Sequence, residues 1–177
     1  MPFARALTGT LIFALMLSLL ACAPALDWRE VRVAQTPLRL LMPCRPHAQD
    51  RTIQLAGQPV QWRLLVCSTG DHSVGVGWAD MGSPAQVGPA LAGLLAAAGA
   101  NLGAATPSAT PLRVPGATPH AGSQQVRVVG RRSDGQPVQM QLALFTFGTS
   151  VFQVTAMGPS VTTDLTEPLM DSLRFQP

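Results

Sequence analysis

The sequence predicts an α+β domain, in which an antiparallel sheet of about six or seven short strands packs with a central helix and a C-terminal helix. Short runs of alternating apolar and polar residues fill residues 30–78 and return at residues 125–157, as expected for strands with one buried face. Between them, residues 83–102 carry apolar side chains at helical spacing, and residues 165–173 repeat that spacing. Strand runs separated by helices in this order are typical of α+β proteins.

The composition indicates one folded domain. The chain has 177 residues, of which 47% are hydrophobic and 12% are charged, so it has enough apolar side chains for a core and too few charges for polyelectrolyte-type disorder. Its formal net charge is +3. Only Arg131 and Arg132 are adjacent basic residues, and no basic stripe is interleaved with aromatic residues. We therefore expect no nucleic-acid partner.

Turn residues separate the strands predicted in the first half. Pro43-Cys44-Arg45-Pro46 ends one apolar run, and Ala56-Gly57-Gln58-Pro59 is typical of a hairpin between two others. The strands predicted from these breaks cover residues 30–34, 38–42, 51–55, 60–68 and 74–78.

The helix predicted at residues 83–102 has a recognisable start, because Ser83-Pro84 combines a good N-cap with a proline suited to the first helical position. The uncharged stretch 82–112 leaves a membrane span as an alternative, and Gly99-Ala100-Asn101-Leu102-Gly103 matches a GxxxG pattern. Alanine and glycine dominate that stretch, however, and they contribute little to membrane insertion. We therefore expect a helix that faces the core and is disturbed at Pro89.

The second half begins with residues 104–124, which are rich in Ala, Thr, Pro, Ser and Gly and are predicted to form a long loop. An antiparallel meander follows, with an Asp134-Gly135 turn between its first two strands. Its strands cover residues 125–130, 138–147 and 150–157.

The N-terminus predicts an export signal. A short basic start, Met1–Arg5, is followed by an apolar run, Ala6–Leu20, which is short compared with the about 20 residues that span a membrane. The run ends in Leu19-Leu20-Ala21-Cys22, which resembles the lipobox of bacterial lipoproteins. This resemblance implies cleavage after Ala21 and a diacylglyceryl thioether on Cys22.

The resemblance also divides the chain. Residues 1–21 would be a lipoprotein signal peptide, residues 22–27 a lipidated N-terminus and short tether, and residues 28–177 a single domain. The alternative is an ordinary secretory signal cut near Ala23 or Ala25. Because alanine follows Cys22, the chain resembles lipoproteins directed to the outer membrane. We therefore expect an outer-membrane lipoprotein that faces the periplasm and contacts the membrane through its Cys22 lipid.

Three segments of the mature chain carry a second resemblance. They are the extended Leu38–Pro43, the hairpin of Gly130 with Asp134-Gly135, and the terminal Met170–Phe175. Together they resemble small bacterial proteins with the Mog1/PsbP-like fold. That fold implies binding or assembly roles and carries no fixed catalytic residues.

Two cysteines of the mature chain have alternative interpretations. Export places Cys44 and Cys67 in an oxidising compartment, where we expect them to form a disulfide that stabilises the fold by roughly 3 kcal/mol. The alternative is a metal site, because His47 follows Cys44 at C-x2-H spacing and His72 follows Cys67 at C-x4-H spacing. Two thiolates and two imidazoles would suit zinc or copper.

The sequence carries no recognisable catalytic constellation. Asp71-His72-Ser73 contains the residue types of a catalytic triad, but triad partners meet through the fold rather than as neighbours in sequence. We therefore expect a non-enzymatic, lipid-anchored binding or assembly module that needs no cofactor and binds an envelope protein. The alternative is a zinc- or copper-binding envelope protein that uses His47 and His72, with or without Cys44 and Cys67.

Overall fold

The computed structural model describes residues 26–103 and 108–176, so the predicted signal peptide and the lipidation site Cys22 lie outside the described residues. The described chain contains ten strands and two helices. They are β1 (Arg29–Arg32), β2 (Leu38–Met42), β3 (His47–Leu55), β4 (Gln58–Thr69), β5 (His72–Asp80), α2 (Pro84–Asn101), β6 (Ser108–Pro111), β7 (Gln124–Arg131), β8 (Pro137–Phe147), β9 (Ser150–Gly158), α3 (Thr163–Asp171) and β10 (Arg174–Phe175).

The predicted α+β class is wrong. The structure is mostly β-sheet, with 49% strand and 18% helix, and it has a seven-stranded antiparallel sheet and a three-stranded sheet in place of one sheet. The sequence pattern missed part of this strand content because the strands at sheet edges lack an alternating apolar signal. Residues 47–50 of β3 are exposed at such an edge, and β6 lies within the segment 104–124 that was expected to be a loop.

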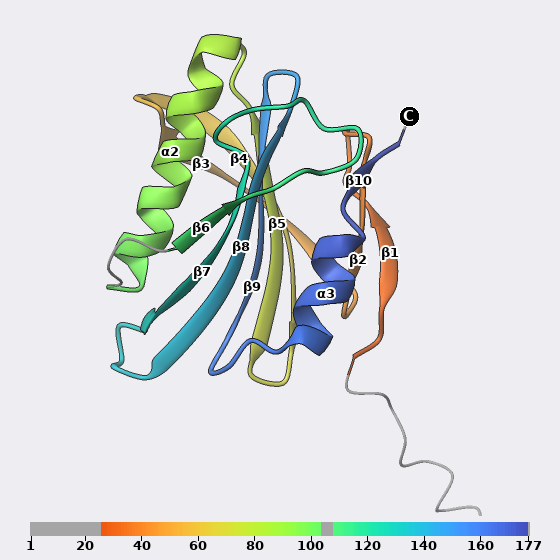
Figure 1. Ribbon diagram of the computed structural model, residues 1–177, viewed down its shortest axis with the longest axis vertical. Helices are drawn as coiled ribbons and strands as arrows, with labels where there is room; N and C mark the ends of the chain where they lie inside the picture. The colour runs from red at the N-terminus through yellow and green to blue at the C-terminus, as the bar shows by residue number, and fades with distance from the viewer. Residues whose placement is uncertain (1–25, 104–107, 177) are drawn as a thin grey trace, which may run out of the picture.

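The large sheet has the strand order β3-β4-β5-β9-β8-β7-β6. Two meanders, β3 to β5 and β7 to β9, meet where β5 pairs with β9, with Val76 opposite Val154. The small sheet has the order β1-β2-β10, so the last strand pairs with β2. Figure 1 shows α2 on one side of the large sheet, and α3 with the small sheet on the other. The domain therefore has three layers, with the large sheet in the middle.

The strands of the large sheet distribute their side chains between two hydrophobic clusters. On β8, Leu142 and Leu144 belong to the cluster beneath α2, whereas Ala143 and Phe145 belong to the cluster beneath α3 and the small sheet. This alternation follows from the two-residue period of a strand. Both clusters lie entirely within residues 26–176, so the described chain contains its own core.

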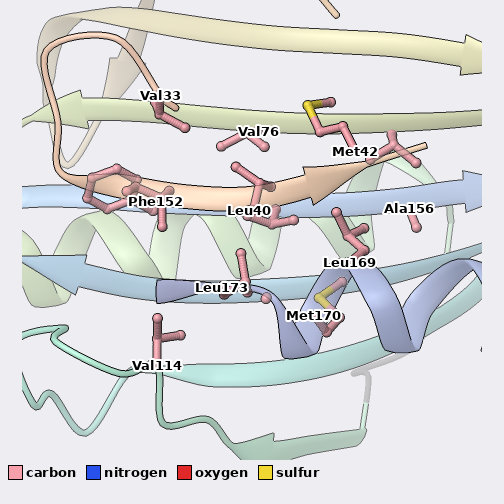
Figure 2. Packing of buried hydrophobic residues seen from close by; sticks show 14 of the residues in the cluster. Val33, Leu40, Met42, Val76, Val114, Phe152, Ala156, Leu169, Met170 and Leu173 are labelled. Carbon is pink, nitrogen blue, oxygen red and sulfur yellow. The ribbon is translucent and has the colours of Figure 1, made fainter. Parts of the chain in front are cut away.

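The cluster beneath α3 draws side chains from both sheets and the helix. Leu40 of β2, Phe152 of β9 and Leu169 of α3 have no exposed surface, and Figure 2 shows them with Leu173 in the space between these elements. The rings of Phe145 and Phe152 stack with their centroids 5.4 Å apart. The helical spacing expected at residues 165–173 is confirmed for Leu165, Leu169 and Met170, which form the buried face of α3, whereas Leu173 is buried just after the helix ends.

Helix α2 agrees with the expected helix at residues 83–102. The Ser83 hydroxyl accepts a hydrogen bond from the Ala85 N–H at 3.3 Å, as an N-cap should. The helix continues past Pro89 to Asn101, and it buries Leu91 and Leu94 against the sheet. Neither helix of the described chain is long and apolar enough to cross a membrane.

Candidate functional site

Cys44 and Cys67 form a disulfide, as predicted, with their Cα atoms 5.9 Å apart. Cys44 follows β2, whereas Cys67 lies on β4 and is only 2% exposed. The bond therefore joins the small sheet to the large sheet. Because both sulfurs are covalently paired and packed against the core, their role in this structure is to hold the two sheets together.

His47 and His72 lie on opposite faces of the large sheet. In the strand register, His47 is opposite Val66 of β4, whereas His72 is opposite Thr69 of the same strand. Directly opposed side chains project from one face, and positions 66 and 69 of a regular strand alternate to different faces. The two imidazoles therefore point to different sides of the sheet.

The imidazole contacts are local. The Nε2 atom of His47 is 2.9 Å from Nε2 of Gln49, and Nε2 of His72 donates to the carbonyl oxygen of Ser160 at 2.7 Å. Because the disulfide also occupies both thiols, the structure does not bring the four candidate metal ligands together. Within residues 26–103 and 108–176, no group of three or more His, Cys, Asp or Glu side chains is placed to hold a metal ion.

A groove lies beneath the C-terminal half of α2, and we call it the α2 groove. Its apolar lining includes Ile53, Trp62, Leu94, Leu102, Met140 and Met157. Its polar lining consists of Arg51, Asn101, Arg132, Ser133 and Gln153. The volume is about 520 Å³, which lies within the range of small-molecule sites. The groove therefore combines an apolar surface with two arginine side chains.

The floor of the α2 groove is set by the strand register. Trp62 is 3% exposed and lies across β5 at Gly77, where a Cβ atom would be 2.7 Å from the indole Nε1. Glycine at this position therefore lets the indole lie flat on the sheet. Met140 of β8 and Met157 of β9 are directly opposite each other and continue the floor.

The rim of the α2 groove carries two arginines from opposite sides. Arg51 is directly opposite Trp62 in the β3–β4 register, so its side chain leaves the sheet on the groove face. Arg132 comes from the turn between β7 and β8. The ion pairs of the described residues join other arginines, namely Arg29, Arg39 and Arg174, to acids. Neither rim guanidinium has a hydrogen bond or an ion pair within the described ranges.

The roof of the α2 groove is fixed at its C-terminal end. The backbone N–H of Arg131 donates to the carbonyl oxygen of Leu102 at 3.0 Å, which ties the end of α2 to β7. The close approach requires Gly130, since a Cβ atom there would be 2.9 Å from the Leu102 carbonyl carbon. Figure 1 shows this end of α2 on the same side of the domain as the β7–β8 turn. Arg132 is therefore held near the groove by backbone contacts.

Two other charged groups have structural roles. The carboxylate of Glu30 accepts hydrogen bonds from Arg39 and Arg174, so it joins all three strands of the small sheet, and the Arg39 contact is the main cause of its lowered pKa. Asp80 accepts a hydrogen bond from the Thr149 hydroxyl at 2.6 Å and another from the Gly82 N–H, and these two bonds lower its pKa.

No protein-family model matches this chain, and no curated protein sequence matches it. The case for its function therefore depends on its own residues. Sequence reasoning did not identify the α2 groove, because Arg51 and Arg132 lie far apart in the chain and each resembles an ordinary surface residue. Gly75 and Gly77, which share one face of a predicted strand, are a signal that could have indicated a large side chain crossing that face.

Proposed function

We propose that this protein is a lipid-anchored, non-enzymatic binding module of the bacterial outer membrane, with its domain on the periplasmic side. The observation that carries the proposal is the position of Cys22, which ends the lipobox-like segment four residues before Leu26. Leu26 already packs against the core, and the Asp27 N–H donates to the Pro43 carbonyl at 2.8 Å. A lipid on Cys22 would hold the domain within about 14 Å of the membrane, since an extended residue spans roughly 3.5 Å.

Two features of the domain support this location. The disulfide of Cys44 with Cys67 is a bond expected in an oxidising compartment outside the cytoplasm. In addition, the small sheet contains the first described strand and carries three arginines at paired positions of adjacent strands, Arg32, Arg39 and Arg174. The only acid on its described strands is Glu30, so the sheet carries net positive charge. Such a surface is weakly attracted to anionic lipid headgroups.

The proposed partner is an envelope protein, and the edge strand β3 supports it. Among the described strands, β3 pairs only with β4, and residues 47–52 are exposed. An exposed edge offers unpaired backbone N–H and C=O groups to which an extended segment of another protein can add a strand. The resemblance to the Mog1/PsbP-like fold, which implies binding or assembly roles, stays a prediction.

The anchor is tested with Cys22→Ala. We expect the unaltered chain to fractionate with the outer membrane and to carry the mass of an acylated N-terminal cysteine, while Cys22→Ala loses both. Ala23→Ser is the matched control, because it leaves the cysteine in place. A Cys22→Ala chain that is processed normally and remains in the membrane fraction would contradict the anchor.

The protein partner is tested with a photo-crosslinking amino acid in place of Gln49, on the exposed edge of β3. The same amino acid in place of Glu167, which is exposed on α3, is the control. We expect one crosslinked envelope protein that depends on the β3 position. Equal crosslinking from both positions, or none from β3, would argue against the edge as the binding surface.

A further inference from the structure

A polar cavity lies where the turn between β1 and β2 meets the large sheet, and we call it the Trp78 cavity. Its volume is about 550 Å³, which lies within the range of small-molecule sites. Its polar lining includes Gln35 from the β1–β2 turn, Gln61 and Arg63 from β4, Trp78 and Asp80 from β5, and Ser150 from β9.

The strand register brings these side chains to one face of the large sheet. Arg63 is directly opposite Trp78 in the β4–β5 pair, and Asp80 is directly opposite Ser150 in the β5–β9 pair. Directly opposed residues share a face, and so do positions 78 and 80 of one strand. The β4–β5 pairing ends at Arg63 and Trp78, although β4 begins at Gln58 and β5 continues to Asp80. Arg63, Trp78 and Asp80 are therefore neighbours on adjacent strands, at the row where the two strands separate.

The Trp78 cavity holds a cation and an anion that are not paired with each other. Arg63 and Asp80 are the charged residues of its described lining, and the ion pairs of the described chain join other residues. Arg63 instead donates a hydrogen bond to the Gln35 amide oxygen, which orients the guanidinium. The Gly82 N–H and the Thr149 hydroxyl both donate to Oδ1 of Asp80, so Oδ2 accepts no hydrogen bond within the described ranges. A ligand that carries both a negative and a positive group would pair with both residues.

Trp78 adds a buried hydrogen-bond donor that has no acceptor. The residue is 5% exposed, and its indole N–H has no hydrogen-bond partner in the described part of the chain. The indole nitrogen can only donate, and nearly all buried polar groups in proteins are paired. Because Trp78 lines the cavity and is directly opposite Arg63, an acceptor bound there would supply the partner that the described fold lacks.

We propose that the Trp78 cavity binds a free α-amino acid. The carboxylate of the amino acid accepts hydrogen bonds from the Arg63 guanidinium and the Trp78 indole N–H, and its ammonium group lies against Oδ2 of Asp80. A simple anion would place its charge beside Asp80, and a simple cation would place its charge beside Arg63, whereas a zwitterion matches both. This inference goes beyond the proposed function, because it depends neither on the lipid at Cys22 nor on a protein partner at β3.

Two amide groups of the lining favour a polar side chain on the amino acid. Nε2 of Gln58 donates to the Met81 carbonyl oxygen at 3.3 Å, and Nε2 of Gln61 donates to the Thr52 hydroxyl at 2.9 Å. Both amide oxygens therefore remain as acceptors. We expect amino acids whose side chains donate hydrogen bonds, such as serine and glutamine, to bind more tightly than valine or leucine, and the reverse order would overturn this role of the two amides.

The binding experiment uses the chain from residue 22 onwards with Cys22→Ser, exported behind a cleavable secretory signal so that the disulfide forms. Both core clusters and the disulfide lie within this chain. Thermal denaturation with each common amino acid in turn identifies the ligand, because a molecule that binds only the folded state raises the Tm. Calorimetric titration then compares that amino acid with its N-acetyl derivative and its C-terminal amide. We expect each derivative to bind about tenfold more weakly, since each lacks one charged group that the cavity pairs.

The indole N–H of Trp78 gives a second readout at the site itself. The chain has three tryptophans, so its isotope-labelled NMR spectrum has three indole N–H resonances. The resonance of Trp78 is the one that is lost in Trp78→Phe. We expect the amino acid to shift this resonance more than those of Trp28 and Trp62. A larger shift of either of those two resonances would place the ligand elsewhere and overturn the site.

Two substitutions test the charges separately. Arg63→Gln should abolish the preference for the free amino acid over its C-terminal amide. Asp80→Asn keeps an acceptor oxygen for the local hydrogen bonds and should abolish the preference over the N-acetyl derivative. Arg132→Gln and Asp50→Asn are the controls, because they remove the same charges from exposed residues outside the cavity and should keep both preferences.

The proposal fails if no amino acid raises the Tm of a folded, disulfide-linked chain, a result that would leave water as the occupant of the cavity. It also fails if both derivatives bind as tightly as the free amino acid, or if Arg63→Gln and Asp80→Asn keep both preferences. None of these results bears on the lipid anchor, which membrane fractionation of Cys22→Ala tests separately.

Discussion

The indole ring of Trp62 lies against the backbone of Gly77, on the neighbouring strand of the large sheet. A Cβ atom at Gly77 would lie 2.7 Å from the indole Nε1 and closer still to two ring carbons. No side chain other than hydrogen fits beneath the ring in this position. The contact therefore determines both the packing of the sheet beneath α2 and the floor of the α2 groove.

Gly77→Ala should destabilise the fold, because Trp62 must leave its position to make room for the methyl group. We expect the free energy of unfolding to fall by about 1–3 kcal/mol, the usual cost of overpacking a core. Guanidinium denaturation followed by circular dichroism measures it. Gly75→Ala is the control, since its methyl group would meet the Thr155 hydroxyl at 3.3 Å and needs only a small adjustment. Equal losses in the two variants would show that the Trp62 contact does not limit position 77.

Replacing both Cys44 and Cys67 with alanine should lower the free energy of unfolding by about 3 kcal/mol, because the unfolded chain is no longer restrained between the two sheets. A reductant should lower the melting temperature of the parent protein and leave that of the double variant unchanged. Cys22→Ser is the control, and it should keep the parent's sensitivity to the reductant. A double variant that is still destabilised by reductant would show that the effect does not arise from this disulfide.

The ion triad of the small sheet should make stability depend on pH. The pKa of Glu30 is lowered below its ordinary value of 4.5 by its hydrogen bonds with Arg39 and Arg174. As pH falls, Glu30 is therefore protonated in the unfolded chain before it is protonated in the folded chain. The stabilisation is present above pH 4.5 and is lost as pH falls through the lower, folded-state pKa.

Glu30→Gln should accordingly be less stable than the parent chain near neutral pH, and the difference should shrink in acid. Chemical denaturation at about pH 7 and about pH 3 measures both values. Glu167→Gln is the control, because Glu167 is exposed on α3 and has no ion pair among the described residues. A difference between Glu30→Gln and the parent that stays constant over this range would show that the Glu30 carboxylate does not stabilise the sheet through its charge.

The central strands and both helices were predictable from sequence because each has one buried face. The spacing of Leu165, Leu169 and Met170 identifies α3, and the alternation along residues 138–147 identifies β8. The fold class was not predictable, because the proportion of strand to helix depends on the edge strands. Residues 47–50 of β3 are exposed and polar, and β10 has only two residues, so neither carries a periodic signal.

The candidate sites divide in a similar way. The disulfide could be predicted, because two cysteines in an exported chain have few other partners. The placement of His47 and His72 on opposite faces could not be predicted, since it depends on the register of β4 with both of its neighbours. The same holds for Arg51 of β3 and Arg132 of the β7–β8 turn, which line one groove only because of the strand order of the large sheet.

Removing either of two buried hydroxyl groups, those of Ser123 and Thr146, should have different effects on the free energy of unfolding. Ser123 is 8% exposed, and its Oγ has no hydrogen-bond partner in the described chain, whereas Thr146 is fully buried and its hydroxyl donates to the Thr118 carbonyl at 3.1 Å. Burying an unpaired hydroxyl costs free energy, so Ser123→Ala should leave stability unchanged or raise it. Thr146→Val keeps the shape but loses the bond, and it should lower the free energy of unfolding by about 1 kcal/mol. Thermal denaturation of both variants beside the parent measures the contrast, and a loss in Ser123→Ala as large as that in Thr146→Val would show that the Ser123 hydroxyl is hydrogen-bonded in solution.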